Sequence, residues 1–187
     1  MATHIALLRG INVGGRNKVA MADLRDIVTS LGHADVVTYI QSGNVVFTAG
    51  EPGRDAKALA TALEQAIATA LDVRPAVVVL SRDDLAQTVR DNPYTSEPDP
   101  KRVHAVFFPE IPSGLAVAIE AAEQREAERG GGATAQMVGH TLFLHTPEGF
   151  GRSELVVYLL NRRASPAATG TARNWATVTK LLALCGS

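Results

Sequence analysis

A glycine-rich loop near the N-terminus carries the residues best suited to bind a phosphate. It runs from Arg9 to Lys18 as RGINVGGRNK and follows a short apolar segment, His4–Leu8. Backbone N–H groups of a loop between a strand and a helix can cradle an anion. The spacing from Gly10 to Gly15 fits the start of a P-loop, but arginine and asparagine then replace the lysine and the magnesium-binding hydroxyl. The dinucleotide fingerprint needs another glycine spacing, so NTPase and Rossmann interpretations are both rejected.

A polar turn, Gln41 to Asn44, separates two segments that are typical of strands, Val36–Gln41 and Val45–Thr48. In a split βαβ unit the first two strands are parallel and the third lies antiparallel beside them, so the ends of strands one and two share one edge of the sheet. We therefore expect the loop and the turn to meet and to form a pocket for an anion or a nucleotide. The expected ligand-binding residues are Arg9, Gly10, Asn12, Gly14, Gly15, Lys18, Gln41, Ser42, Gly43 and Asn44.

The same residues also fit a purely local role. Glycines permit positive φ at tight turns, and the side chains of Ser42 and Asn44 can cap the turn that contains them. The sequence alone leaves both interpretations open.

Two further candidate sites lie in the C-terminal third. Arg152 and Ser153 stand at an expected helix N-terminus, where the helix dipole favours an anion, although a simple Ser153 N-cap is the favoured interpretation. Arg173, Asn174 and Trp175 begin the last helix. There we favour an N-cap role for Asn174 and a core role for Trp175 over stacking on a ligand.

The usual catalytic motifs are missing from the sequence. Its five histidines show no metal-ligand spacing, and there is no GxSxG, no CxxC and no acidic triad for a metal. The single cysteine, Cys185, cannot form an intrachain disulfide. No catalytic residue, metal or cofactor is assigned, and whether the protein is an enzyme stays open.

Composition is that of an ordinary folded protein. The 187 residues are 46% hydrophobic and 20% charged, with a formal net charge of −1, so no global positive field indicates a nucleic acid. No apolar stretch approaches the roughly 20 residues that span a membrane. We expect a cytoplasmic protein that binds no membrane and whose partner is an anionic small molecule or nucleotide.

The C-terminal region supplies an alternative function. From residue 151 onward the basic side chains outnumber the acidic ones; these are Arg152, Arg162, Arg163, Arg173 and Lys180, opposed by Glu154. A module that binds RNA or another nucleic acid through this basic face is therefore the alternative. An interaction scaffold without a small ligand is the third hypothesis.

Hydrophobic periodicity predicts the order of the elements. Residues 1–81 show the pattern strand-helix-strand-strand-helix-strand, residues 82–101 form a connecting helix and a polar linker, and residues 102–187 repeat the pattern and end in a helix. Ser81 with Asp84 predicts a capping box, and Ser113 is the expected N-cap of a later helix. The predicted fold is α+β, with two tandem ferredoxin-like (split βαβ, alpha-beta plait) subdomains and an additional C-terminal helix.

Several segments together resemble one known family. The stretches ALLRGINVGG, KVAMADLR and VTYIQSGNVVF, and later NPY, VFF, GRS and TARNWATV, are similar to the bacterial family catalogued as domain of unknown function 1697. Departures are Tyr94, where phenylalanine is common, and Ala176, where asparagine is common. The resemblance covers essentially the whole chain and implies two ferredoxin-like subdomains. It implies no activity and no catalytic residues.

Overall fold

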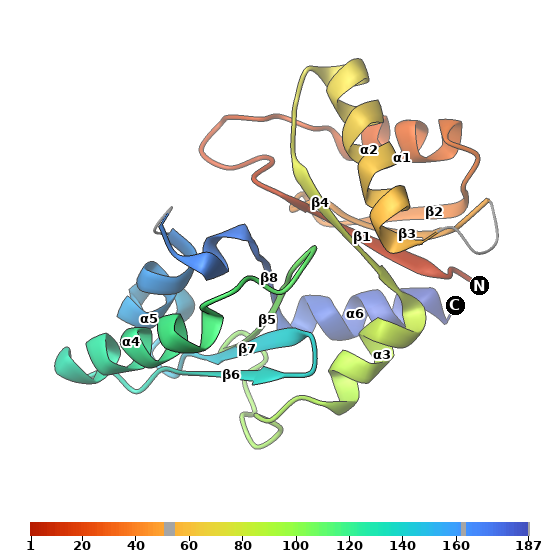
Figure 1. The fold of residues 1–187 in the computed structure, drawn as a ribbon. Helices are drawn as coiled ribbons and strands as arrows, with labels where there is room; N and C mark the ends of the chain where they lie inside the picture. The colour runs from red at the N-terminus through yellow and green to blue at the C-terminus, as the bar shows by residue number, and fades with distance from the viewer. Residues whose placement is uncertain (51–54, 162–163, 187) are drawn as a thin grey trace. The chain divides into compact units, whose positions relative to one another are not determined.

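The chain folds into two α+β units. The structure is a computed structural model that describes residues 1–50, 55–161 and 164–186. One compact unit comprises Met1–Gln87 with Lys180–Ser187, and the other comprises Thr88–Thr179. Each contains one four-stranded antiparallel sheet with helices (Figure 1). The predicted architecture of two tandem plaits followed by a C-terminal helix is confirmed.

In the first unit the strands lie in the order β2-β3-β1-β4. Because β1 is central, its residues Ile5 to Leu8 are all buried, on both faces of the sheet. Helices α1 and α2 lie on the same face (Figure 1) and bury Leu24, Leu59 and Leu63 against it. The bounds are β1 His4–Arg9, α1 Met21–Ser30, β2 Ala34–Tyr39, β3 Asn44–Thr48, α2 Ala56–Leu71, β4 Ala76–Ser81 and α3 Arg82–Arg90.

The second unit repeats this topology with the strand order β6-β7-β5-β8. Leu115 and Ala122 of α4 and Leu155 of α5 pack in one core with Val106 and Leu142 of the sheet. The bounds are β5 Val103–Phe107, α4 Leu115–Glu128, β6 Thr134–Val138, β7 Thr141–His145, α5 Glu154–Val156 and β8 Thr171–Asn174. The last helix, α6 Trp175–Cys185, begins in this unit, and its residues from Lys180 onward belong to the first.

Some predicted helix boundaries are confirmed and others are wrong. The capping box is present: the Asp84 N–H donates to Ser81 Oγ at 3.0 Å, and the Ser81 N–H donates to Asp84 Oδ2 at 3.1 Å. The expected Ser113 cap is wrong, because Gly114 is the N-cap of α4, with φ 78°, a conformation that glycine adopts without a Cβ clash. The helix expected from Ser153 is broken into short α5 and a π-helical turn, Val157–Asn161.

His104 is a buried titratable residue in the second unit. Its ring stacks on Phe150 with 4.0 Å between the centroids, and the residue is 9% exposed. Burial lowers the pKa of this imidazole from 6.5 to about 4. Because the unfolded chain binds the proton more tightly, the stabilisation is complete above pH 6.5 and is lost as the pH falls towards 4.

We expect this titration to reduce the free energy of unfolding by about 3 kcal/mol over that range. The variant His104→Phe should keep the ring packing and flatten this part of the pH profile, as measured by urea unfolding from about pH 7 to about pH 4. His140→Asn, at an exposed histidine of the β6–β7 turn, is the control and should behave as the parent. A parental slope in His104→Phe would contradict the assignment.

Candidate functional site

Asn12 joins the glycine-rich loop to the turn after β2. Its Nδ2 donates to the carbonyl oxygens of Val19 and Gln41, each at 2.9 Å, and its Oδ1 accepts from the Val19 N–H at 2.9 Å. The Leu8 N–H also donates to the Gly43 carbonyl oxygen at 2.8 Å. The loop and the turn therefore meet at one edge of the sheet, as the strand order predicts.

An open hollow of about 480 Å³ lies where the two segments meet. Four expected site residues line it: Asn12, Gly15, Lys18 and Gln41. Val19 and Ala20, which lead into α1, complete the lining and were not predicted. A Pro, Ser or Asp cap before the helix would have drawn attention to this position; the sequence has an alanine there, which gives no such signal.

The N-terminus of α1 is open beside this hollow. Its N-cap, Ala20, has extended backbone angles and makes no side-chain capping bond. Within the described chain, nothing accepts a hydrogen bond from the N–H groups of Met21, Ala22 or Asp23. Unpaired N–H groups of a first turn carry the positive end of the helix dipole, which Asp23, exposed in that turn, offsets in part.

Cationic side chains gather at the same edge. Arg16 and Lys18 are exposed and Arg9 is partly exposed, and none of the three forms an ion pair with any residue that the structure describes. Arg74 is a fourth cation that sequence reasoning missed. It is exposed and stands two residues before Ala76, the cross-strand partner of Arg9. The predicted strand order could have revealed Arg74, because β4 begins at the edge of the sheet where β1 ends.

Other expected residues shape the turn and do not line the hollow. Asn44 is fully buried, and its Nδ2 donates to the Tyr39 carbonyl oxygen at 3.0 Å and to Ser42 Oγ at 2.8 Å. Gly43 is needed for close packing, because a Cβ there would lie 2.7 Å from Leu8 Cβ and from Ile11 Cδ1.

Gly10 and Gly14 serve the path of the loop. Both have positive φ, 73° and 58°, and face open space. A residue with a Cβ at either position would have the conformational cost of positive φ but would clash with no neighbouring atom.

At the first secondary candidate, an internal carboxylate occupies the helix N-terminus. Ser153 is the N-cap of α5 and accepts from the Val156 N–H at 3.2 Å, which confirms the favoured interpretation. Glu126 Oε2, from α4, accepts from Ser153 Oγ at 3.0 Å and from the Leu155 N–H at 2.8 Å. Glu126 is only 4% exposed, so its charge takes the place of an external anion. Arg152 beside it is exposed.

At the second secondary candidate, the residues have structural partners. Asn174 Oδ1 accepts from the Thr177 N–H at 2.9 Å, which confirms the N-cap. The Trp175 ring lies 6.1 Å from that of Phe143. Burial lowers the pKa of Arg173 to about 10, and its Nη1 donates to the carbonyl oxygen of Ala172. Arg173 is therefore not an exposed cation.

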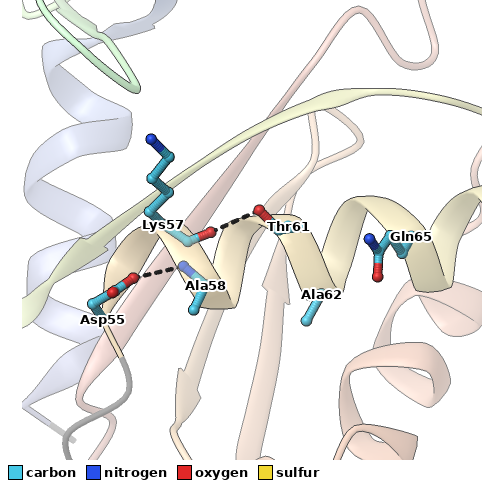
Figure 2. A pocket seen from close by; sticks show the side chains of 6 residues that line it. All are labelled: Asp55, Lys57, Ala58, Thr61, Ala62 and Gln65. Atoms are coloured by element: carbon cyan, nitrogen blue, oxygen red, sulfur yellow. Dashed lines mark hydrogen bonds between the residues drawn. The ribbon is translucent and has the colours of Figure 1, made fainter.

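A second hollow, of about 440 Å³, runs along α2 (Figure 2). One helix and its N-cap supply the whole lining, from Asp55 to Gln65. Asp55 Oδ1 already accepts from the Ala58 N–H at 2.7 Å, and Thr61 Oγ1 donates to the Lys57 carbonyl oxygen at 3.0 Å. Because no second segment among the described residues contributes a group, the described part of this surface offers no convergent set of ligand contacts.

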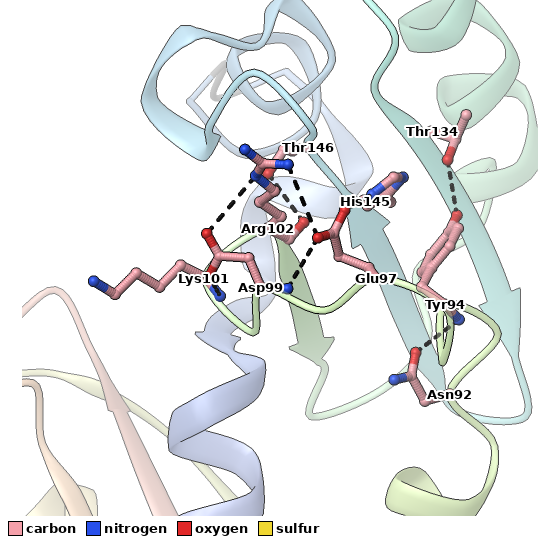
Figure 3. Close-up of polar contacts among 9 residues, drawn as sticks. All are labelled: Asn92, Tyr94, Glu97, Asp99, Lys101, Arg102, Thr134, His145 and Thr146. Atoms are coloured by element: carbon pink, nitrogen blue, oxygen red, sulfur yellow. Dashed lines mark hydrogen bonds and ion pairs between the residues drawn. The ribbon is translucent and has the colours of Figure 1, made fainter.

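A polar cluster attaches the segment after α3 to the sheet of the second unit (Figure 3). The Tyr94 ring stacks on His145, its hydroxyl accepts from Thr134 Oγ1, and Glu97 Oε2 lies 2.8 Å from His145 Nε2. The hydrogen bond with His145 is the main cause of a lowered pKa at Glu97. Glu97 Oε1 also accepts from the Asp99 N–H. Each carboxylate oxygen of Glu97 thus has a partner, which indicates a structural role.

The described residues contain neither a candidate metal site nor a candidate membrane-spanning helix. In that part of the chain, no three His, Cys, Asp or Glu side chains are grouped so as to hold a metal ion. Likewise, no helix in the described ranges has the length and apolarity needed to cross a membrane.

Fold and site together define an α+β protein of two plait units, with an open hollow flanked by cations at one edge of the first sheet. The model of the family described as protein of unknown function (DUF1697) matches residues 1–140, and the chain belongs to this family. Among solved structures it is similar to the conserved bacterial protein SP0830 from Streptococcus pneumoniae, with 26% identity over 98% of each chain and a TM-score of 0.71. No curated protein matches the chain.

The Asn12 amide should be worth more to stability than other loop side chains. We expect Asn12→Gly, which keeps the positive φ and removes three hydrogen bonds, to cost about 2 kcal/mol in urea unfolding. Asn17→Gly is the matched control: Asn17 also has positive φ, and its Nδ2 makes one hydrogen bond, to Gly10. Its cost should stay at about 1 kcal/mol or less. Equal costs would show that Asn12 does not hold the two segments together.

The internal carboxylate of Glu126 gives a second stability prediction. We expect Glu126→Gln to cost about 2 kcal/mol, because glutamine has one acceptor oxygen where the carboxylate has two. If the amide oxygen accepts from the Ser153 hydroxyl and the Leu155 N–H, the amide NH2 faces the Ala133 N–H, which donates to the other carboxylate oxygen. Glu128→Gln, exposed on the same helix, should change stability by less than about 0.5 kcal/mol. Chemical denaturation of both variants at neutral pH decides the matter, and a neutral Glu126→Gln would contradict the capping role.

Proposed function

We propose that this protein binds a phosphate-bearing small molecule or a nucleotide at the hollow between the Arg9–Lys18 loop and the Gln41–Asn44 turn. The observation that carries the proposal is the lining of that hollow by both segments, with Lys18 in it and the uncapped N-terminus of α1 beside it. The first-turn N–H groups and the Lys18 ammonium have no partner among the described residues. Such groups are the donors from which a phosphate accepts hydrogen bonds.

The chemistry of the lining supports binding and assigns no reaction. Among the residues that the structure describes, its side chains are amides, an ammonium and small apolar groups, without a carboxylate, an imidazole or a thiol. General acid–base or nucleophilic catalysis requires a group of that kind within hydrogen-bond reach of the substrate. We therefore propose a ligand-binding protein and name no catalytic residue.

Magnitudes limit what the charges can contribute. A helix N-terminus contributes about 0.3–1 kcal/mol to an anion, and each exposed ion pair about 0–1 kcal/mol. With Arg16 and Lys18 as the partners, bare phosphate would bind with a Kd of about 1 mM or weaker. Useful affinity thus needs contacts to the rest of the ligand.

The nucleic-acid alternative has less support. Of the basic residues it requires, Arg162 and Arg163 lie outside the described residues, and Arg173 is only partly exposed. Arg152 and Lys180 are exposed but belong to different units. No observation therefore places a continuous basic face on either unit.

A thermal-shift panel of pyrophosphate and nucleotides tests the proposal. At 100 times its Kd, a ligand should stabilise the parent by about 2.7 kcal/mol. The double variant Arg16→Gln/Lys18→Gln should weaken binding by about tenfold or more, because a loss of about 1.4 kcal/mol is tenfold in Kd. The control, Lys101→Gln/Arg129→Gln, makes the same change of charge at exposed positions of the second unit and should respond as the parent.

Equal responses of the two double variants would remove the hollow as the site. The nucleic-acid alternative predicts instead that the logarithm of the binding constant for single-stranded RNA falls with the logarithm of the salt concentration, with a slope near −0.7 for each phosphate contact. Binding with that salt dependence, abolished by Arg152→Gln, would favour this alternative.

A further inference from the structure

Ile40, at the start of the turn after β2, has an unusual backbone. Its φ is 50°, in the left-handed region, where a β-branched side chain is an outlier. The side chain is nevertheless 50% exposed. Burial in the core therefore does not explain why an isoleucine occupies this position.

Two side-chain amides hold Ile40 in this conformation. Asn44 Nδ2 donates to the carbonyl oxygen of the residue before it, Tyr39, and Asn12 Nδ2 donates to the carbonyl oxygen of the residue after it, Gln41. Asparagine or glycine would adopt the same φ at lower cost. The fold thus maintains the turn against the preference of isoleucine, and strained positions of this kind occur at ligand-binding segments.

Val13 is a second exposed aliphatic residue at the same place. It is 68% exposed and sits in the tight turn in which the Arg16 N–H donates to its carbonyl oxygen at 3.1 Å. Asn12 and Gln41 both line the hollow, and the Asn12 amide donates a hydrogen bond to the Gln41 carbonyl oxygen. Val13 directly follows Asn12 in the chain, and Ile40 directly precedes Gln41. The two aliphatic residues are thus the chain neighbours of two lining residues and do not themselves line the hollow.

We propose that Ile40 and Val13 contact the part of the ligand that is not phosphate, here called its body, and that they select phosphate monoesters whose body is apolar or aromatic. This inference rests on the proposed function. The charges alone bind phosphate weakly, and apolar contact supplies the remaining affinity. An aryl phosphate, or a nucleotide through its base, belongs to this class. A phosphate ester with a small polyol body does not.

The test compares phenyl phosphate with glycerol 1-phosphate by calorimetry. The parent should bind phenyl phosphate about tenfold more tightly, as expected for burial of part of one aliphatic side chain. Ile40→Asn should reduce that difference several-fold by weakening the binding of phenyl phosphate, since Val13 is left to contact the ligand body. Ile111→Asn is the matched control: it makes the same substitution at 45% exposure in the second unit, and it should retain the preference.

The Tm without ligand is a second readout. Removing Ile40 should raise it if the residue serves the ligand and lower it if the residue serves the fold. Without ligand, Ile40→Asn should raise the Tm by roughly 2–4 °C, because asparagine tolerates positive φ. A lower Tm would overturn the inference by showing that the fold needs the isoleucine.

The outcomes separate this inference from the proposed function. Equal affinity of the parent for the two probes, with both weakened by Arg16→Gln/Lys18→Gln, would overturn the role of Ile40 and leave the phosphate site standing. Absence of binding by either probe to the parent would overturn both.

Discussion

The candidate site depends on one side-chain amide. Asn12 uses both hydrogens and the oxygen of its amide on backbone groups of Val19 and Gln41. These bonds hold the loop after β1, the entry to α1 and the turn after β2 in one place. Since its polar atoms already have partners, Asn12 forms the wall of the hollow, and Lys18, Gln41 and the N–H groups of α1 remain to meet a ligand.

Two helix N-termini in this protein meet the same physical requirement differently. The first turn of any helix has N–H groups without intrahelical acceptors. At α5 the Ser153 hydroxyl and the buried Glu126 carboxylate accept from them, whereas the N-cap of α1 is Ala20, which has no side-chain acceptor. The chain therefore neutralises one positive helix end internally and leaves the other open beside a hollow. This difference is the reason that the edge of the first sheet is the stronger candidate for the proposed anion site.

Local patterns predicted most of the fold because their causes are local. The Ser81 and Asp84 capping box and the Asn174 cap each involve residues three positions apart, and the structure contains both. The continuous helix expected from Ser153 was wrong: the segment is bonded at its start to Glu126 of α4, 27 positions away, and it continues as a π-helical turn. The Ser113 cap failed because the next residue is a glycine, which allows the chain to enter the helix one position later.

From the residue pattern alone, one obtains the order of the elements, the family likeness and the edge at which the loop and the turn must meet. The pattern cannot say which polar side chains at that edge stay available to a ligand. Asn44 is buried in its own turn, and Asn12 is engaged by a residue 29 positions away. Likewise, Ser153 is bonded to a carboxylate 27 positions away. Availability is decided by such long-range hydrogen bonds, which exist only once packing has brought distant segments together.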